Sequence, residues 1–152
     1  MRRWGRWILL GMVVGGCLLL WGFSLANGER SAKTSGAVWE AVNQWLRDLG
    51  VQWQISHRTV RKTAHFLGFF ALGVITAAAL RLFGVRRYPL AAWIVVFLVA
   101  CADEGIQRFV PGRGPSLSDV LLDVAGGSCG ILAFLLPVSG LLAFRFKQRK
   151  KL

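Results

Sequence analysis

Three short groups of polar and ionisable residues lie within or beside strongly apolar runs of the chain. Each group contains residues three or four positions apart, and residues at this spacing share one face of a helix. Carboxylate, imidazole and ammonium groups can act as general bases, bind phosphate or coordinate cations. We therefore take these groups as candidate site residues: Lys62 and His65; Asp103, Glu104 and Gln107; Asp119 and Asp123.

The segment between the second and third groups adds two candidates. It has two prolines and two glycines between Arg108 and Ser116, which predicts a sharp and rigid path. Arg113 in this segment could hold a phosphate together with Lys62. Ser116 is a candidate ligand, although Ser116 and Ser118 are better explained as caps of the following helix than as nucleophiles, because no nucleophile motif surrounds them.

Three kinds of chemistry are open to these residues. The catalytic candidates are Glu104, Asp123 and His65, and either carboxylate could act as a general base on a bound phosphate. The same side chains could instead bind a ligand without reacting with it. A divalent cation is the third case, and the sequence does not favour it, because no two histidines stand one helical turn apart. The ligand-binding candidates are Lys62, Asp103, Gln107, Arg113, Ser116 and Asp119.

The elements that must position these groups are membrane-spanning helices. The chain has 152 residues, of which 55% are hydrophobic, and a formal net charge of +12. Apolar runs of about twenty residues bounded by basic residues suit helices that cross a bilayer. We predict an all-α, integral membrane four-helix bundle in a single domain over residues 1–152, with spans at about 8–26, 64–80, 90–106 and 118–144.

The lengths of the spans place the three groups at one level. Counting about twenty residues from the basic end of each span puts all of them close to the same membrane boundary. Ionisable residues at membrane depth normally face a bundle interior or a water-filled cavity, which makes them functional candidates. The simpler alternative is that the carboxylates only pair with Lys62, Arg108 and Arg113 and so close this end of the bundle.

The distribution of basic residues predicts the orientation of the chain. Residues 1–7, 81–89 and 145–152 carry arginine or lysine and no acid, which favours the cytoplasmic side for both termini (N-in, C-in). The basic tail suits anionic lipid, so we expect membrane lipids and no nucleic acid as partners. The oligomeric state stays open.

The first apolar run has an alternative interpretation as a signal peptide. Its start is basic, and residues 24–26 (Ser-Leu-Ala) resemble a cleavage site. We favour a membrane span, because the apolar stretch is longer than the usual core of a signal peptide.

The segment after the first span divides into two parts. Residues 27–36 are rich in Gly, Ser, Lys and Asn, which predicts a loop. Apolar residues then recur at helical spacing, which predicts a short amphipathic helix that Gly50 can end. This helix could lie on the outer membrane surface or form a cap over the bundle. These apolar residues are Val38, Val42, Trp45 and Leu49.

Small residues are concentrated in the fourth span. Gly126 and Gly130 stand four positions apart, and this spacing lets helices approach closely in a membrane. We therefore expect one face of the fourth span to pack tightly against a neighbouring helix.

Two motifs carry a family resemblance. They are Lys62-x-x-His65-Phe66-x-x-Phe69 and Asp103-Glu104-x-x-Gln107-x-Phe109-x-Pro111-Gly112-Arg113-x-x-Ser116-x-x-Asp119-Val120-x-x-Asp123-x-x-Gly126. Together they resemble the signature of VanZ-like membrane proteins, over about residues 60–130. Asp123 departs from this pattern, because we expect the family more often to have asparagine there, and an extra carboxylate favours a cation.

The resemblance implies a small multi-pass protein of the bacterial cell membrane. The family is named for an accessory protein that raises resistance to the glycopeptide teicoplanin without making altered peptidoglycan precursors. Members also occur outside resistance clusters, so the resemblance does not imply that this chain confers resistance.

We expect a polar site at the outer leaflet. This site would bind or act on a cell-envelope lipid or precursor, such as a lipid-linked or phospholipid ligand. Its action would affect susceptibility to teicoplanin-type glycopeptides. One alternative is a membrane-embedded hydrolase or transferase that acts on a lipid phosphate or head group; whether the chain is an enzyme stays open. The other alternative is a structural partner of another membrane protein. Such a partner would tolerate changes in the polar groups but not in the glycines of the fourth span.

Overall fold

The structure is a computed structural model that describes residues 2–25, 28–111 and 116–149, and the side chains of residues 4–25, 36–111 and 116–136. These ranges contain helices and no strand. The helices are α1 (Arg2–Leu25), α2 (Gly28–Asp48), α3 (His57–Leu82), α4 (Tyr88–Gln107) and α5 (Leu117–Arg149). The prediction of an all-α fold is therefore confirmed for the part of the chain that the structure describes.

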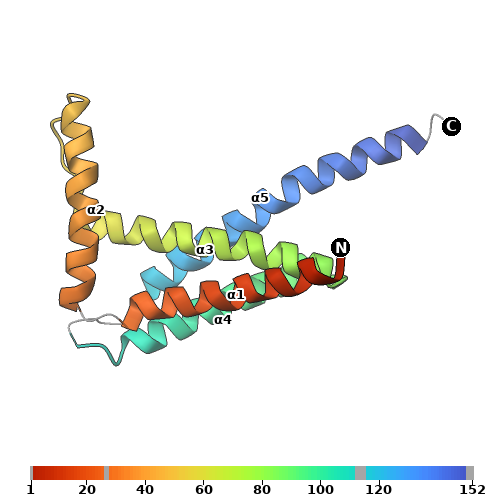
Figure 1. Cartoon of the computed structure of the whole chain (residues 1–152), viewed down its shortest axis with the longest axis horizontal. Helices are drawn as coiled ribbons and strands as arrows, with labels where there is room; N and C mark the ends of the chain where they lie inside the picture. Colours follow the sequence, from red (N-terminus) through yellow and green to blue (C-terminus); the bar gives the residue numbers. More distant parts are fainter. Residues whose placement is uncertain (1, 26–27, 112–115, 150–152) are drawn as a thin grey trace.

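Four of the helices are long and apolar enough to cross a membrane. They run side by side in alternating directions, so α1 begins and α5 ends at the same end of the bundle (Figure 1). This arrangement confirms the predicted four-helix bundle, whereas the side of the membrane on which the termini lie stays a prediction. The spans are Trp4–Leu25, His57–Leu82, Tyr88–Gln107 and Leu117–Leu136.

Helix α2 lies across one end of this bundle, at a steep angle to the other helices (Figure 1). The expected amphipathic helix is present, and Gly50, with a φ of 82°, directly follows its last turn as predicted. The prediction of a loop over residues 27–36 is wrong, because α2 already begins at Gly28. This segment has no proline, and its Glu, Ala and Lys residues favour a helix, so the helix extends through it.

Asn43 joins α2 to the start of α3. Its side chain is almost completely buried, its Oδ1 atom accepts a hydrogen bond from the main-chain N–H of Ile55 at 2.8 Å, and its Nδ2 atom donates to the carbonyl oxygen of Trp39 at 2.9 Å. The indole of Trp39 also donates to the carbonyl of Ile55 and stacks on the ring of His57, with the ring centroids 4.3 Å apart. These contacts hold α2 against the end of the bundle.

The closest helix contact in the bundle is between α3 and α5. A Cβ atom added at Gly126 would collide with the carbonyl oxygen of Phe66, and one at Gly130 would collide with that of Phe70. The two backbones therefore touch along this face, as the spacing of the glycines predicts. Phe69 and Val96 are fully buried in the apolar core beside this contact.

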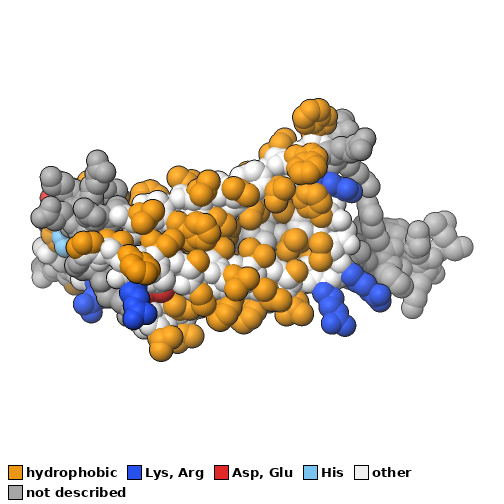
Figure 2. Space-filling model, turned by 90° about the horizontal axis from the view of Figure 1, so that it is seen from below, with side chains coloured by type: hydrophobic (Ala, Val, Ile, Leu, Met, Phe, Trp, Pro, Cys, Tyr) orange, Lys and Arg blue, Asp and Glu red, His pale blue; other side chains and the backbone are white. Residues whose placement is uncertain are grey.

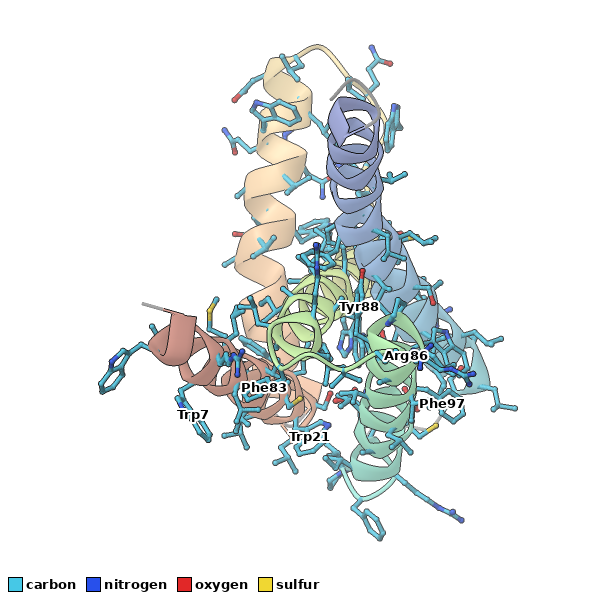
Figure 3. The ribbon with its side chains drawn as sticks, turned by 90° about the vertical axis from the view of Figure 1, so that its right-hand side faces the viewer. Trp7, Trp21, Phe83, Arg86, Tyr88 and Phe97 are labelled. Atoms are coloured by element: carbon cyan, nitrogen blue, oxygen red, sulfur yellow. The ribbon has the colours of Figure 1, made fainter. Side chains whose placement is uncertain are left out.

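The surface of the four spans is apolar between two charged ends. Figure 2 shows hydrophobic side chains over the middle of the bundle and lysine or arginine side chains at both ends. Helix α1 contributes strongly to this surface, because only 6% of its most apolar stretch of 18 residues is buried inside the protein. Figure 3 looks onto the end opposite α2, where Trp7 and Phe83 form an edge-to-face pair with centroids 6.1 Å apart. This pattern suits a protein surrounded by lipid.

The contact between α3 and α5 gives a test of the fold. Replacing Gly130 with alanine should lower the melting temperature of the detergent-solubilised protein, because the new methyl group would force the backbone of Phe70 away, and overpacking of this kind costs about 1–3 kcal/mol. Gly105→Ala on α4 is the matched control, since no atom lies within 4 Å of the added Cβ atom. Circular dichroism on heating measures both variants; equal melting temperatures would contradict the tight contact.

Candidate functional site

The polar groups meet at the end of the bundle that lies beside α2. Because the helices alternate in direction, the last turns of α1 and α4 come to the same end as the first turns of α3 and α5 (Figure 1). Each of these four helices places at least one polar side chain there: Ser24 from α1; Lys62 and His65 from α3; Asp103, Glu104 and Gln107 from α4; Asp119 and Asp123 from α5. The predicted common level of the groups therefore corresponds to one place in the fold.

Asp103 is fully buried and is held from two helices. Its Oδ2 atom accepts a hydrogen bond from the hydroxyl of Ser24 at 2.7 Å and another from the amide of Gln107 at 2.9 Å. The amide of Gln107 also lies 3.4 Å from the hydroxyl oxygen of Ser24. The other carboxylate oxygen of Asp103, Oδ1, is buried without a hydrogen-bond partner among the described residues.

His65 lies between two buried carboxylates. Its Nδ1 atom is 4.0 Å from Oδ2 of Asp103 and 3.7 Å from Oδ1 of Asp123. Only 1% of the surface of Asp123 is exposed, and neither of its carboxylate oxygens has a hydrogen-bond partner in the described structure. His65, Asp103 and Asp123 are therefore the part of the site whose residue types could hold a cation.

Lys62 and Asp119 form the ion pair with the shortest distance in this site. The Nζ atom of Lys62 is 2.8 Å from Oδ1 of Asp119, and both side chains are partly exposed. Within the described residues, Asp103, Glu104 and Asp123 have no lysine or arginine within ion-pair distance, and Arg108 forms no ion pair there. Among the described residues, charge pairing with lysine or arginine thus accounts for Asp119 but not for Asp103, Glu104 or Asp123.

Glu104 connects α4 to the start of α5. Its Oε2 atom accepts a hydrogen bond from the main-chain N–H of Ser116 at 2.8 Å, while its Oε1 atom is buried without a hydrogen-bond partner among the described residues. The carbonyl oxygen of Ser116 accepts from the N–H of Asp119, so Ser116 is at the predicted cap position of α5. Ser118 is already inside the helix, and its hydroxyl is 2.7 Å from that of Ser116. Arg113 lies outside the described residues.

Two hollows adjoin the polar cluster. The first has a volume of about 10 Å³, which is about what one water molecule or small ion requires. The second is an open groove of about 340 Å³ between α3 and α5. Lys62 lines both of them. The small pocket is lined by Arg61, Lys62, His65, Gln107, Asp119, Leu122 and Asp123, and the groove by Arg58, Thr59, Lys62, Thr63, Phe66 and Leu122.

Ser24 is a site residue that the sequence analysis did not identify. It was considered only as part of a possible signal-peptide cleavage site, yet it is fully buried and donates to Asp103. The available signal was its depth: a lone hydroxyl in the last turn of α1 lies at the level of the carboxylates of α4. The contact also gives α1 a role in orienting the site.

Replacement of Ser24 with alanine should lower the melting temperature of the purified protein in detergent. A buried hydrogen bond contributes about 0.5–3 kcal/mol, with the larger values for charged partners. Ser128→Ala on α5 is the matched control, because the hydroxyl of Ser128 donates only to the carbonyl oxygen of Val124 in its own helix in the described structure. The role given to Ser24 would be wrong if the control lost as much stability as Ser24→Ala.

Comparison with known proteins identifies the family. The model of the VanZ/LLP1 family matches residues 7–140, which include all four spans and every residue of the polar cluster. Neither the curated proteins nor the solved structures contain a match to the sequence. Because the family model covers most of the chain, this protein belongs to the VanZ/LLP1 family of membrane proteins.

Proposed function

We propose that this protein binds the phosphate-bearing head group of a membrane lipid at the end of the bundle beside α2. The observation that carries the proposal is the position of Lys62, which lines both the groove between α3 and α5 and the small polar pocket. A lipid in the groove would bring its phosphate to Lys62 and its head group towards His65. An ammonium group is a common protein ligand for phosphate.

The lining of the groove supports a lipid rather than a soluble phosphate compound. Arg58 and Thr59 come from the first turn of α3, where a spanning helix meets the membrane boundary. Phe66 and Leu122 lie deeper along the same groove and are apolar. A lipid has the matching order of groups, because its phosphate lies at the boundary and its acyl chains lie beneath it.

The location that we propose is the cell membrane of a bacterium, with both termini in the cytoplasm and the site at the outer leaflet. Support comes from the exposed Arg81, Arg86 and Arg87 at the end of the bundle where α1 begins, since cytoplasmic loops are rich in basic residues. In this orientation the ligand is an envelope lipid or lipid-linked precursor. Binding of such a ligand would link the protein to teicoplanin-type susceptibility.

Lipid retention tests the role of Lys62. Wild-type protein extracted from vesicles of phosphatidylglycerol and phosphatidylethanolamine should keep bound phospholipid in native mass spectrometry. Lys62→Gln should weaken this binding about tenfold or more, as expected for the loss of a charge-assisted hydrogen bond worth about 1.5–3 kcal/mol. Arg108→Gln is the matched control, because it removes an exposed charge at the same end of the bundle outside the groove.

A double variant separates phosphate binding from the ion pair. Lys62→Gln alone leaves Asp119 without its partner, whereas Lys62→Gln with Asp119→Asn removes both charges of the pair. If Lys62 binds phosphate, the double variant should be as weak as the single one. Full retention of lipid by the double variant, or equal loss in Arg108→Gln, would contradict the proposal.

A second candidate function is hydrolysis or transfer of the head group. The observation that favours it is the contact of His65 with Asp123 at the wall of a pocket about the size of one water molecule. The imidazole could take a proton from a water or hydroxyl in this pocket as its oxygen attacks the phosphorus that Lys62 holds. The bond from phosphorus to the leaving alcohol would then break, and the imidazolium would return the proton to that alcohol. Asp123 would orient the imidazole and stabilise its charged form.

Turnover distinguishes the two candidate functions. If the protein is an enzyme, wild-type protein incubated with the same vesicles should release or exchange head groups, and His65→Ala should slow this reaction about 100-fold or more, as expected for a general base. Lipid retention should persist in His65→Ala, because the histidine does not line the groove. Mass spectrometry of the lipid fraction measures both; absence of turnover in the wild type would leave binding as the function.

A further inference from the structure

Three buried or half-buried side chains from three helices bring together atoms of the kind that ligate metals. One nitrogen of His65 on α3 and one oxygen each of Asp103 on α4 and Asp123 on α5 all lie within 4.8 Å of one another. We propose that these residues bind a divalent transition-metal cation such as Zn²⁺ or Mn²⁺. This inference goes beyond the proposed lipid site, because it requires neither a lipid nor turnover.

The distances suit a shared cation. Three ligand atoms that each lie about 2.1 Å from one metal are about 3.4–3.6 Å apart. The Nδ1 atom of His65 is 3.7 Å from Oδ1 of Asp123 and 4.0 Å from Oδ2 of Asp103, so both distances would shorten by a few tenths of an ångström when a metal binds. The separation of the two carboxylate oxygens, which is no more than 4.8 Å, would shorten by up to about 1 Å through side-chain rotation.

The unpaired carboxylate oxygens are an independent sign of a missing ligand. Both oxygens of Asp123 and one oxygen of Asp103 are buried and have no hydrogen-bond partner among the described residues, although the two side chains are 1% and 0% exposed. Burial of a carboxylate without a partner is energetically unfavourable. A cation beside His65 would give Asp123 a partner, and it would also contact Oδ2 of Asp103, the oxygen that Ser24 and Gln107 hold in place.

The charges around the cluster also favour a cation. Asp103, Asp123 and Glu104 are buried at the same end of the bundle, while Lys62, which lines the adjoining pocket together with Arg61, is paired with Asp119. Ser24 and Gln107 hold Asp103 in place by hydrogen bonds, as residues around a metal commonly do for its ligands. The small pocket beside His65 and Asp123 gives a further ligand access to an open coordination position.

The ligand types indicate which cations fit. An imidazole nitrogen is a good ligand for Zn²⁺ and other transition metals and also occurs with Mn²⁺, whereas Ca²⁺ and Mg²⁺ prefer sites made of oxygen atoms. With one nitrogen and two carboxylate ligands, the cluster suits Zn²⁺ or Mn²⁺ better than either alkaline-earth ion. The sequence does not favour a cation, because no two histidines stand one helical turn apart and each helix supplies only one of the three ligands.

Metal titration of the full chain tests the inference. The protein would be purified in detergent with an affinity tag that contains no histidine, stripped with a chelator and titrated with Zn²⁺ and with Mn²⁺ by calorimetry. We expect one ion per chain and a rise in the melting temperature. Asp123→Asn and His65→Gln should each weaken binding tenfold or more. Asp48→Asn on α2 is the matched control and should bind as the wild type does, because this carboxylate is exposed and lies outside the polar cluster.

Pulsed electron paramagnetic resonance of bound Mn²⁺ reports directly on the atoms that ligate the metal, in the wild type as well as in variants. Coupling of the manganese to an imidazole nitrogen should appear in the wild type and vanish in His65→Gln. The proposal would be overturned by the absence of binding at millimolar metal, by bound Mn²⁺ without nitrogen coupling, or by equal affinity in wild type and a folded Asp123→Asn variant. Each of these results would leave the lipid proposal standing, since lipid retention is measured separately.

Discussion

The contact between the backbones of α3 and α5 is the constraint on which the site depends. Gly126 lies against the carbonyl of Phe66, the residue that directly follows His65, and Asp123 stands one turn before Gly126. The close approach therefore brings the imidazole of His65 to 3.7 Å from the carboxylate of Asp123. A side chain at position 126 would separate the two backbones and with them the two polar groups. Gly126 thus allows the close packing of α3 and α5 and also brings His65 and Asp123 together.

Burial of the carboxylates works against stability unless something compensates for it. In a membrane-spanning bundle, the apolar surfaces gain little from leaving lipid for protein, and the helices depend on close packing and on hydrogen bonds between them. Asp103 has such bonds from Ser24 and Gln107, but Asp123 has none in the described structure. A cluster made only to hold helices together would pair its acceptors. Asp123 contacts His65 at 3.7 Å but accepts no hydrogen bond in the described structure, and this favours a ligand over a purely structural role.

The level of each polar group along the membrane normal could be predicted from the sequence, but its neighbours across the bundle could not. Hydropathy and basic residues predict the spans, and helical spacing predicts that Asp103 shares a face with Gln107. Which carboxylate meets His65 depends on the rotation of each helix about its axis, and this is set by contacts such as that of Gly126 with Phe66. Glu104 accepts a hydrogen bond from the main-chain N–H of Ser116, and its catalytic role stays a prediction. Ser24 was missed because a lone serine carries no periodic signal.

Lys62 connects the two proposals without making either depend on the other. Its ammonium group pairs with Asp119 at 2.8 Å, one turn from Asp123, and it also lines the groove that we assign to a lipid. A phosphate in the groove would compete with Asp119 for Lys62, because one ammonium group shared between two anions binds each of them less tightly. A cation held by His65, Asp103 and Asp123 would offset this competition by adding positive charge beside Asp119. Lys62 lines the groove and the pocket, whereas His65 and Asp123 line only the pocket. This arrangement suits a ligand whose phosphate enters from the bilayer.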